Sequence, residues 1–305
     1  MNTGTLHGRS VAGWVRLVEA VGADDWDRPT PCSEWSVRDL VNHVVGEDRW
    51  TAPLMQGQTM AEVGDRLDGD LLGVDPHTAA AAAADEATGA VAARLRAGAQ
   101  VHLSYGDEDP DEYVRQLVAD HVIHGWDLAR AIGADDTLDP ELVDEVARWF
   151  ADRADMYRAA GVVAAPVDDP EPAGAQAALL AAFGRDPRWT ATRAVVLRLA
   201  DAFGAGDVDA IMAALSPDCV FEATSPPPDG DRVEGAVAVR AVFADLFGQT
   251  AQARFETEEV VDLGDRAVLR WRFSWGGEAP GHVRGVDVLR VEGSAVSEKL
   301  SYVKG

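Results

Sequence analysis

The chain has 305 residues, roughly twice the length of an ordinary domain, so we expect two domains that each bury their own hydrophobic core. Its formal net charge of -25 at pH 7 disfavours nucleic acid and anionic membrane surfaces as partners and leaves small molecules as the expected ligands. The cysteines Cys32 and Cys219 form no CxxC pair, and no apolar run reaches membrane-spanning length, so we expect a cytoplasmic protein without disulfides.

Apolar residues recur at helical spacing up to about residue 160. One predicted helix opens at Ser36, where Asp39 three residues later completes a capping box, and another ends before Gly133. An alanine-rich run adds a segment of high helix propensity. Helices joined by short loops form a bundle. The predicted helices cover about residues 10–21, from residue 36 onward, 78–98, about 111–131 and 140–160.

Proline, glycine and charged residues interrupt this pattern over residues 161–187, which we interpret as a linker that ends in a short helix. We therefore predict an N-terminal all-α domain over residues 1–187 and a second domain over residues 188–305.

In the second domain, short helices lead into segments whose apolar residues alternate with period two. Helices followed by a run of strands predict an α+β domain in which a curved antiparallel sheet wraps around helices. The predicted helices cover residues 191–206, 207–215 and 236–249, and the predicted strands 253–263, 266–275, 281–291 and 295–303.

The segment DHVIHGWDLARAIG, residues 120–133, carries the first candidate site. Asp120 and His124 stand four residues apart, so on a helix both side chains can contact one ion. His43 on the earlier helix could supply a third ligand, and two imidazoles with one carboxylate leave a coordination position open. The alternative is an Asp/His pair that occurs at this spacing by chance.

Neighbouring residues are weaker candidates for a role in this site. His121 lies in the apolar stripe of its helix, so we expect a packed core histidine rather than a ligand. Glu47, one turn after His43, is expected to be solvated. Trp35 and Trp126 could line a pocket, but tryptophan on a bundle helix more often packs in the core.

Three stretches together, TPCSEWSVRDLVNHVVG, DHVIHGWDLARAIG and FGRDP, resemble the DinB-like bundle of the mycothiol-dependent maleylpyruvate isomerase type. The resemblance covers about residues 5–187. It implies that His43, Asp120 and His124 hold a divalent metal ion, often zinc, and that mycothiol is a co-substrate. Asp120 stands where that family usually has glutamate, so its shorter arm must bring the helices closer or bind through water.

In the second domain Asp287 shares the apolar face of a predicted strand with Val283 and Leu289. Burying a carboxylate is unfavourable unless it is paired, and a buried carboxylate suits general-base catalysis. We therefore take Asp287 and His282 as candidate catalytic residues. The alternative is a salt bridge to Arg284 or Arg290.

The second domain resembles the SnoaL-like branch of the cone-shaped fold that nuclear transport factor 2 and ketosteroid isomerase share. The stretches that carry this resemblance are LADAFGAGDVDAIMAALSPDCVFE, VEGAVAVRAVF and RGVDVLRVEGSAVSEKLSYVKG, within residues 190–303. It implies an isomerase, a cyclase or a protein without catalysis, and a homodimer formed through the sheet.

Three functions follow. The first is a divalent-metal-dependent thiol transferase or isomerase that acts on a small organic substrate, in which the SnoaL-like domain binds substrate or dimerises. The second is an isomerase or cyclase that uses Asp287, with the bundle as a metal-stabilised scaffold. The third is a small-molecule binding protein without catalysis.

Overall fold

The structure is a computed structural model that describes residues 2–94, 100–168, 173–249, 254–277 and 280–304. The chain divides into two compact units, Met1–Trp189 and Thr190–Gly305, and each contains its own apolar core. None of the helices within the described ranges combines the length and apolar character that crossing a membrane requires.

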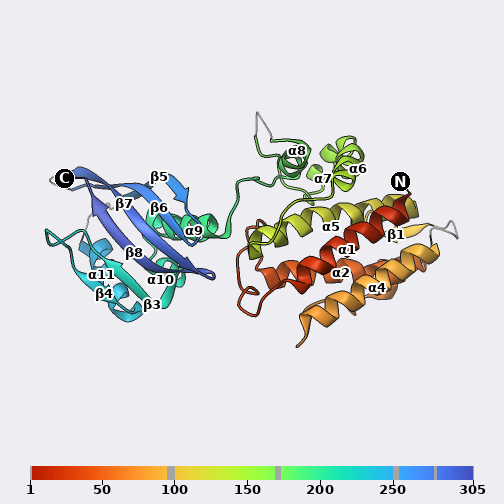
Figure 1. Ribbon diagram of the computed structural model, residues 1–305, viewed down its shortest axis with the longest axis horizontal. Helices are drawn as coiled ribbons and strands as arrows, with labels where there is room; N and C mark the ends of the chain where they lie inside the picture. The colour runs from red at the N-terminus through yellow and green to blue at the C-terminus, as the bar shows by residue number, and fades with distance from the viewer. Residues whose placement is uncertain (1, 95–99, 169–172, 250–253, 278–279, 305) are drawn as a thin grey trace. The chain divides into compact units, whose positions relative to one another are not determined.

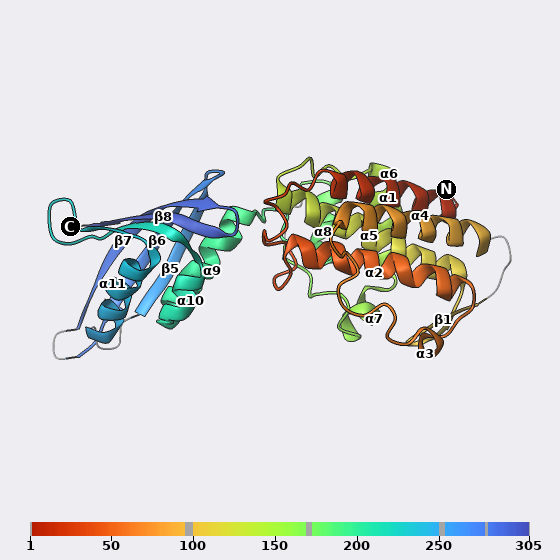
Figure 2. The same ribbon diagram turned by 90° about the horizontal axis from the view of Figure 1, so that it is seen from below.

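Four long helices form a bundle in the N-terminal unit, which confirms the predicted all-α fold (Figures 1 and 2). They are α1 (Thr3–Glu19), α2 (Val37–Met55), α4 (Pro76–Arg94) and α5 (Pro110–Ile132). Helices α1 and α2 each pack against both α4 and α5. The connections hold α3 (Met60–Val63) and a hairpin of β1 (Val101–Leu103) and β2 (Gly106–Glu108).

Local signals determine where these helices begin and end. Ser36 and Asp39 form the predicted capping box of α2. Helix α5 begins after the N-cap Asp109 and ends at Gly133, whose φ of 71° closes the helix in a conformation that favours glycine. Helix α1 begins at Thr3 rather than at the predicted Ser10, because the Asn2 side chain accepts a hydrogen bond from the Thr5 amide. Predicted helical residues 95–98 lie outside the described ranges.

The prediction of one helix over residues 140–160 is wrong, because the structure has two helices there, α6 (Pro140–Ala151) and α7 (Ala154–Ala159). Helix α6 ends at Asp152, and Arg153 turns away from helical geometry and donates hydrogen bonds to Glu112 on α5. The short helix predicted at the end of the linker is present as α8 (Ala175–Ala182), which packs against α6 and buries Leu179 and Leu180 in the bundle core. Burying each leucine stabilises the unit by about 1.5–3 kcal/mol, so this end of the predicted linker is part of the bundle.

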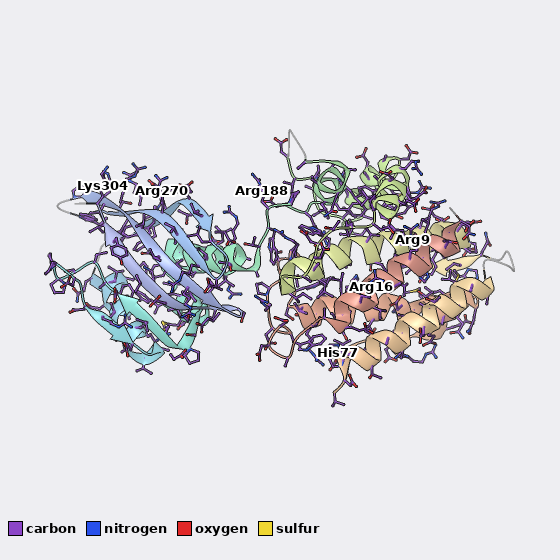
Figure 3. The ribbon with its side chains drawn as sticks, viewed as in Figure 1. Arg9, Arg16, His77, Arg188, Arg270 and Lys304 are labelled. Atoms are coloured by element: carbon purple, nitrogen blue, oxygen red, sulfur yellow. The ribbon has the colours of Figure 1, made fainter. Side chains whose placement is uncertain are left out.

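Surface ion pairs also connect α1 to α6. The Arg9 guanidinium on α1 pairs with the carboxylates of Asp139 and Glu141 at the beginning of α6 (Figure 3). These side chains remain at least 30% exposed, so the pairs orient α6 more than they stabilise it.

In the C-terminal unit, three helices pack on one sheet, as the α+β prediction requires (Figure 2). The helices are α9 (Ala191–Ala205), α10 (Val208–Ala213) and α11 (Ala236–Gln249). The strands are β3 (Leu215–Glu222), β4 (Arg232–Glu234), β5 (Arg254–Asp262), β6 (Arg266–Trp275), β7 (Gly281–Glu292) and β8 (Ala295–Val303). Predicted strand residue 253 lies outside the described ranges.

The sheet has the strand order β4-β3-β8-β7-β6-β5 and is mixed, not purely antiparallel as predicted. Strand β3 pairs with β8 in parallel, and the chain crosses over between them through α11 and four intervening strands, β4 to β7. Register shifts interrupt the β3/β8, β5/β6 and β7/β8 ladders. Such bulges bend strands, so the sheet curves around α9 and α11.

Replacing the cap of α2 tests how much this local signal contributes. Ser36→Ala should lower the free energy of unfolding of the N-terminal unit by about 1 kcal/mol, because the Asp39 amide loses its acceptor. Urea denaturation followed by circular dichroism measures the change. The exposed Ser33, in the same loop, supplies the matched control Ser33→Ala. Equal midpoints for both variants would contradict the role of the cap.

Candidate metal centre

Helices α2 and α5 bring together the three residues that the sequence identified as metal ligands. Asp120 and His124 stand one turn apart on α5, and His43 faces them from α2. One ligand atom from each residue lies within 4.8 Å of the other two. The predicted set is therefore a spatial cluster.

The distances suit a single ion. Asp120 Oδ1 lies 3.4 Å from His124 Nε2, and Asp120 Oδ2 lies 3.6 Å from His43 Nε2. A tetrahedral zinc ion with bonds of about 2.0–2.1 Å holds its ligand atoms about 3.3 Å apart. The aspartate therefore reaches both imidazoles despite being shorter than glutamate.

Two further observations favour an ion here. Asp120 Oδ2 is buried and has no hydrogen-bond partner in the part of the chain that the structure describes. The side chains of His43 and Asp120 are 30% and 27% exposed, whereas that of His124 is 9% exposed. An ion at this position would satisfy the Asp120 oxygen and keep one side open to a substrate.

Asp127 fixes the orientation of His124. Its carboxylate is fully buried and its Oδ2 lies 3.0 Å from His124 Nδ1, so His124 presents Nε2 to Asp120. Arg185, which follows α8, donates to the same Asp127 oxygen at 2.8 Å. A carboxylate that binds the second imidazole nitrogen in this way is typical of metal-ligating histidines.

Cys32 extends this network from the loop between α1 and α2. Its Sγ lies 3.4 Å from Asp127 Oδ2 and 3.2 Å from Arg185 Nη2. One ligand atom from each of Cys32, His124 and Asp127 also lies within 4.8 Å of the other two, so these residues could contact a single ion. Arg185 already occupies the Asp127 carboxylate, however, so His43, Asp120 and His124 make the better ligand set.

The two tryptophans differ in role. Trp35 packs its ring against His43 at 4.7 Å and against His124 at 5.8 Å between centroids, so it covers one side of the cluster. Trp126 is 1% exposed and packs in the bundle core, as expected for tryptophan on a bundle helix.

The cluster is strongly polarised. Although burial opposes it, Asp120, Asp127 and Cys32 raise the pKa of His124 well above its usual value. Burial would raise the pKa of Asp120, but the facing imidazoles of His124 and His43 outweigh it and hold that pKa well below its usual value. Without an ion, His124 is therefore an imidazolium between two carboxylates.

Glu47 is not the solvated residue that the sequence suggested. It is only partly exposed on α2, and burial together with the nearby Asp120 carboxylate raises its pKa. A turn of α2 separates Glu47 from His43, which places its carboxyl beside the open ligand set.

His121 is buried, as expected, but it is not surrounded only by apolar groups. Its side chain is 1% exposed, and its Nε2 lies 3.2 Å from Asp48 Oδ1. It points away from the cluster of His43, Asp120 and His124, because it follows Asp120 by one residue on the helix.

In the C-terminal unit, Asp287 is buried on the concave face of the sheet, and its partner is neither Arg284 nor Arg290. Lys299 Nζ on β8 lies 2.8 Å from Asp287 Oδ2, and the Ser301 hydroxyl donates to Asp287 Oδ1 at 2.7 Å. The two charges are 3% and 9% exposed. The β7/β8 register places Ser301 opposite Asp287 and Lys299 opposite Leu289, so Lys299 reaches Asp287 as a diagonal neighbour, which spacing along one strand does not reveal.

His282 does not join Asp287. The β6/β7 register runs without a shift between them, so five residues place their side chains on opposite faces of β7. His282 is exposed and Asp287 is buried. The structure therefore separates the two residues that the sequence paired as acid and base.

Asp287 and Lys299 line a small recess whose free volume of about 20 Å³ has room for little more than a water molecule. Aromatic side chains form much of its wall, namely Phe203, Phe255 and Trp271. Trp271 Nε1 is buried and lacks a hydrogen-bond partner across the described ranges. The recess thus combines apolar walls with a polar end, but it is far smaller than the clefts of about 300–1,000 Å³ that hold drug-sized ligands.

Comparison with known families places both units. Residues 7–129 match the model of the mycothiol maleylpyruvate isomerase N-terminal domain, and residues 196–298 match that of the SnoaL-like domain. Uncharacterized protein Rv0738 of Mycobacterium tuberculosis is 36% identical over 146 residues, which cover 46% of this chain and 72% of that protein.

Two solved structures resemble this chain over about one third of its length. An NTF2-like protein of unknown function from Mesorhizobium loti is 36% identical, with 37% of this chain and 91% of that chain covered and a TM-score of 0.34. A putative polyketide cyclase from Sinorhizobium meliloti is 21% identical, with 35% and 92% covered and a TM-score of 0.30.

Removing the Asp127 charge tests the support beneath the cluster. Asp127→Asn leaves the Arg185 guanidinium without its buried partner, so the free energy of unfolding should fall by about 3–5 kcal/mol. Urea denaturation measures this change. Asp70→Asn breaks an exposed pair with Arg38 and should change stability little. Equal losses in both variants would contradict the central position of Asp127.

Metal uptake should release a proton. Because its raised pKa keeps His124 protonated near pH 7, ligation by its Nε2 must displace about one proton per ion. Zinc affinity should therefore fall as pH falls below the pKa of His124. Isothermal titration calorimetry in buffers of different ionisation enthalpy counts the protons, and His124→Ala should reduce the count. A pH-independent affinity between about pH 6 and 8 would rule this out.

Proposed function

The chain belongs to the family of the mycothiol maleylpyruvate isomerase N-terminal domain and carries a SnoaL-like domain behind it, and from this premise we propose that it is a divalent-metal-dependent thiol transferase or isomerase. Its substrate is a small organic molecule, its thiol is of the mycothiol type, and its metal is zinc. The N-terminal unit performs the chemistry.

One observation carries this proposal. The imidazoles of His43 and His124 meet the Asp120 carboxylate, and Asp120 Oδ2 is buried with no hydrogen-bond partner among the described residues. The side chains of His43 and Asp120 remain partly exposed, so this group of ligands is open on one side. A structural site is closed to solvent, because protein groups surround its ion on every side. His43, Asp120 and His124 supply three ligands and so leave a position for a thiol or a substrate.

The residues around the ligands have distinct roles. A divalent ion bound there would lower the pKa of a thiol on its open side and so supply a thiolate at neutral pH. Asp127 and Arg185 hold His124 in the ligating orientation. Trp35 shields one side of the cluster from water, and the Glu47 carboxyl, whose pKa is raised, can exchange a proton with a substrate.

The SnoaL-like unit binds substrate in its recess or joins two chains through its sheet. The aromatic rings around Lys299 favour an apolar ligand with one polar group, and the recess would have to widen to admit it, because its free volume is about 20 Å³. Dimerisation through the sheet would give a homodimer with two such recesses.

A second candidate function places the chemistry in this recess. A buried carboxylate that faces an aromatic cavity could act as general base in an isomerase or cyclase, with the bundle as a metal-stabilised scaffold. Lys299 argues against it, because the ion pair occupies one Asp287 oxygen and Ser301 occupies the other.

A pair of variants separates the two functions. The zinc-loaded full chain is assayed with mycothiol and maleylpyruvate, followed by a panel of small electrophiles. His43→Ala should lower kcat/KM by about 100-fold or more and reduce zinc content, since a lost ligand should matter at least as much as a lost supporting group. Asp287→Asn should act on KM rather than kcat. His77→Ala, which alters a histidine outside the cluster, is the control.

The opposite pattern supports the second function: Asp287→Asn abolishes turnover, and folded His43→Ala retains it. Binding of substrate without turnover in any sample would favour a small-molecule binding protein and contradict both enzymes. Wild-type protein that neither binds zinc nor changes its thermal stability with zinc would contradict the proposed metal centre.

A further inference from the structure

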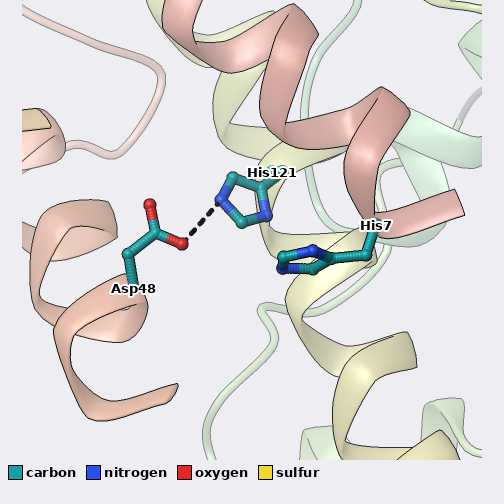
Figure 4. A group of neighbouring side chains, drawn as sticks. All are labelled: His7, Asp48 and His121. Atoms are coloured by element: carbon teal, nitrogen blue, oxygen red, sulfur yellow. Dashed lines mark ion pairs between the residues drawn. The ribbon is translucent and has the colours of Figure 1, made fainter. Parts of the chain in front are cut away.

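A second group of ionisable side chains lies inside the bundle, away from the open cluster. His7 on α1, Asp48 on α2 and His121 on α5 converge from three helices (Figure 4). They are 0%, 0% and 2% exposed. One ligand atom from each lies within 4.8 Å of the others.

His121 is held in one orientation by its own helix. Its Nδ1 lies 2.7 Å from the Leu117 carbonyl oxygen, which can only accept, so Nδ1 carries the hydrogen. The other nitrogen, Nε2, faces Asp48 Oδ1 at 3.2 Å. In the neutral ring this directs a lone pair at a carboxylate oxygen, a contact that either a proton on Nε2 or a metal ion bound to both atoms would stabilise. A backbone carbonyl that fixes the tautomer in this way is typical of a metal-ligating histidine.

The cluster also contains many unpartnered atoms. Both nitrogens of His7, both oxygens of Asp48 and Nε2 of His121 are buried without a hydrogen-bond partner among the residues the structure describes. A buried polar group that nothing satisfies destabilises a fold, because it has lost its hydrogen bonds to water. A proton on His121 would serve only the pair with Asp48 Oδ1 and would leave His7 and Asp48 Oδ2 unsatisfied.

We propose that His7, Asp48 and His121 form a second metal site, closed to solvent, for a divalent ion of the zinc class. His7 supplies one nitrogen, His121 supplies Nε2 and Asp48 supplies a carboxylate oxygen, so three residues bind the ion. The 3.2 Å between His121 Nε2 and Asp48 Oδ1 agrees with the separation of about 3.3 Å between ligands of tetrahedral zinc. Two imidazoles and a carboxylate are ligands that zinc accepts.

The two sites differ in exposure and therefore in role. The proposed site shares no ligand with His43, Asp120 and His124, and it has no exposed side, so it binds no substrate. An ion there would join α1, α2 and α5, the helices that carry or support the open cluster. Its contribution is to folding stability, as in structural zinc sites.

Zinc content of the full chain tests this proposal. Wild-type protein and a His43→Ala/His124→Ala variant, which removes two ligands of the open cluster, are purified from zinc-supplemented cells and dialysed against EDTA at low concentration. Elemental analysis should find about one buried ion per chain that remains in the double variant. X-ray absorption at the zinc edge should show two imidazoles bound to that ion.

A variant of the proposed site completes the experiment. His7→Phe preserves the ring shape in the core and should lose the retained ion, whereas the matched control His77→Phe should keep it. Circular dichroism verifies that each variant folds. If His7→Phe does not fold, the double variant and its X-ray absorption spectrum decide the outcome.

The outcomes separate this proposal from the proposed function. A double variant that contains no zinc, while wild-type protein contains about one ion, overturns the second site and leaves the open cluster intact. Zinc in the double variant without imidazole scattering also overturns it. Loss of the ion in His7→Phe with the open cluster still loaded supports it.

Discussion

The buried Asp127 carboxylate joins three segments that lie far apart in the sequence. It accepts hydrogen bonds from Arg185 and from His124, and the Cys32 thiol lies against it. A carboxylate without solvent is tolerated only when it is paired, and Arg185 supplies that charge. Because the same oxygen orients His124, the geometry of the open cluster depends on a residue that follows α8.

Helix α5 serves two clusters because its residues point in different directions. Asp120, His124 and Asp127 recur at spacings of four and three, so they share one face and meet α2 and the Cys32 loop. His121 follows Asp120 by one residue and so points into the interior, toward His7 and Asp48. One exposed ligand set and one buried set therefore arise from a single turn of helix. The first suits chemistry with a substrate, and the second suits the stability of the bundle.

In the C-terminal unit, the buried carboxylate of Asp287 is neutralised by a lysine on the neighbouring strand. Asp287 and Lys299 stand on neighbouring strands, and Ser301 hydrogen bonds with both. Their position among Phe203 and Phe221 makes the pair a polar end to an aromatic recess. Such a pair restrains the sheet and marks the place where a ligand's polar group would compete for one of its partners.

Local signals in the sequence identified the long bundle helices and the Asp120/His124 pair, although they missed the beginning of α1 and the break between α6 and α7. The capping box at Ser36, the stop at Gly133 and the four-residue spacing of Asp120 and His124 are properties of adjacent turns, so they can be identified without a structure. His43 could be proposed because it lies on a helix expected to pack nearby, and family resemblance supported it.

Partners that lie far away in the chain were decided only by the tertiary structure. No spacing relates Asp127 to Arg185, Asp48 to His121 or Asp287 to Lys299, because helix packing and strand pairing bring each of them together. The parallel pairing of β3 with β8 was missed for the same reason. The sequence by itself determined the helices that carry His43, Asp120 and His124, whereas the group of His7, Asp48 and His121 came only from the tertiary structure. The packing of those helices decided which nitrogen faces which oxygen, and which cluster is open to solvent.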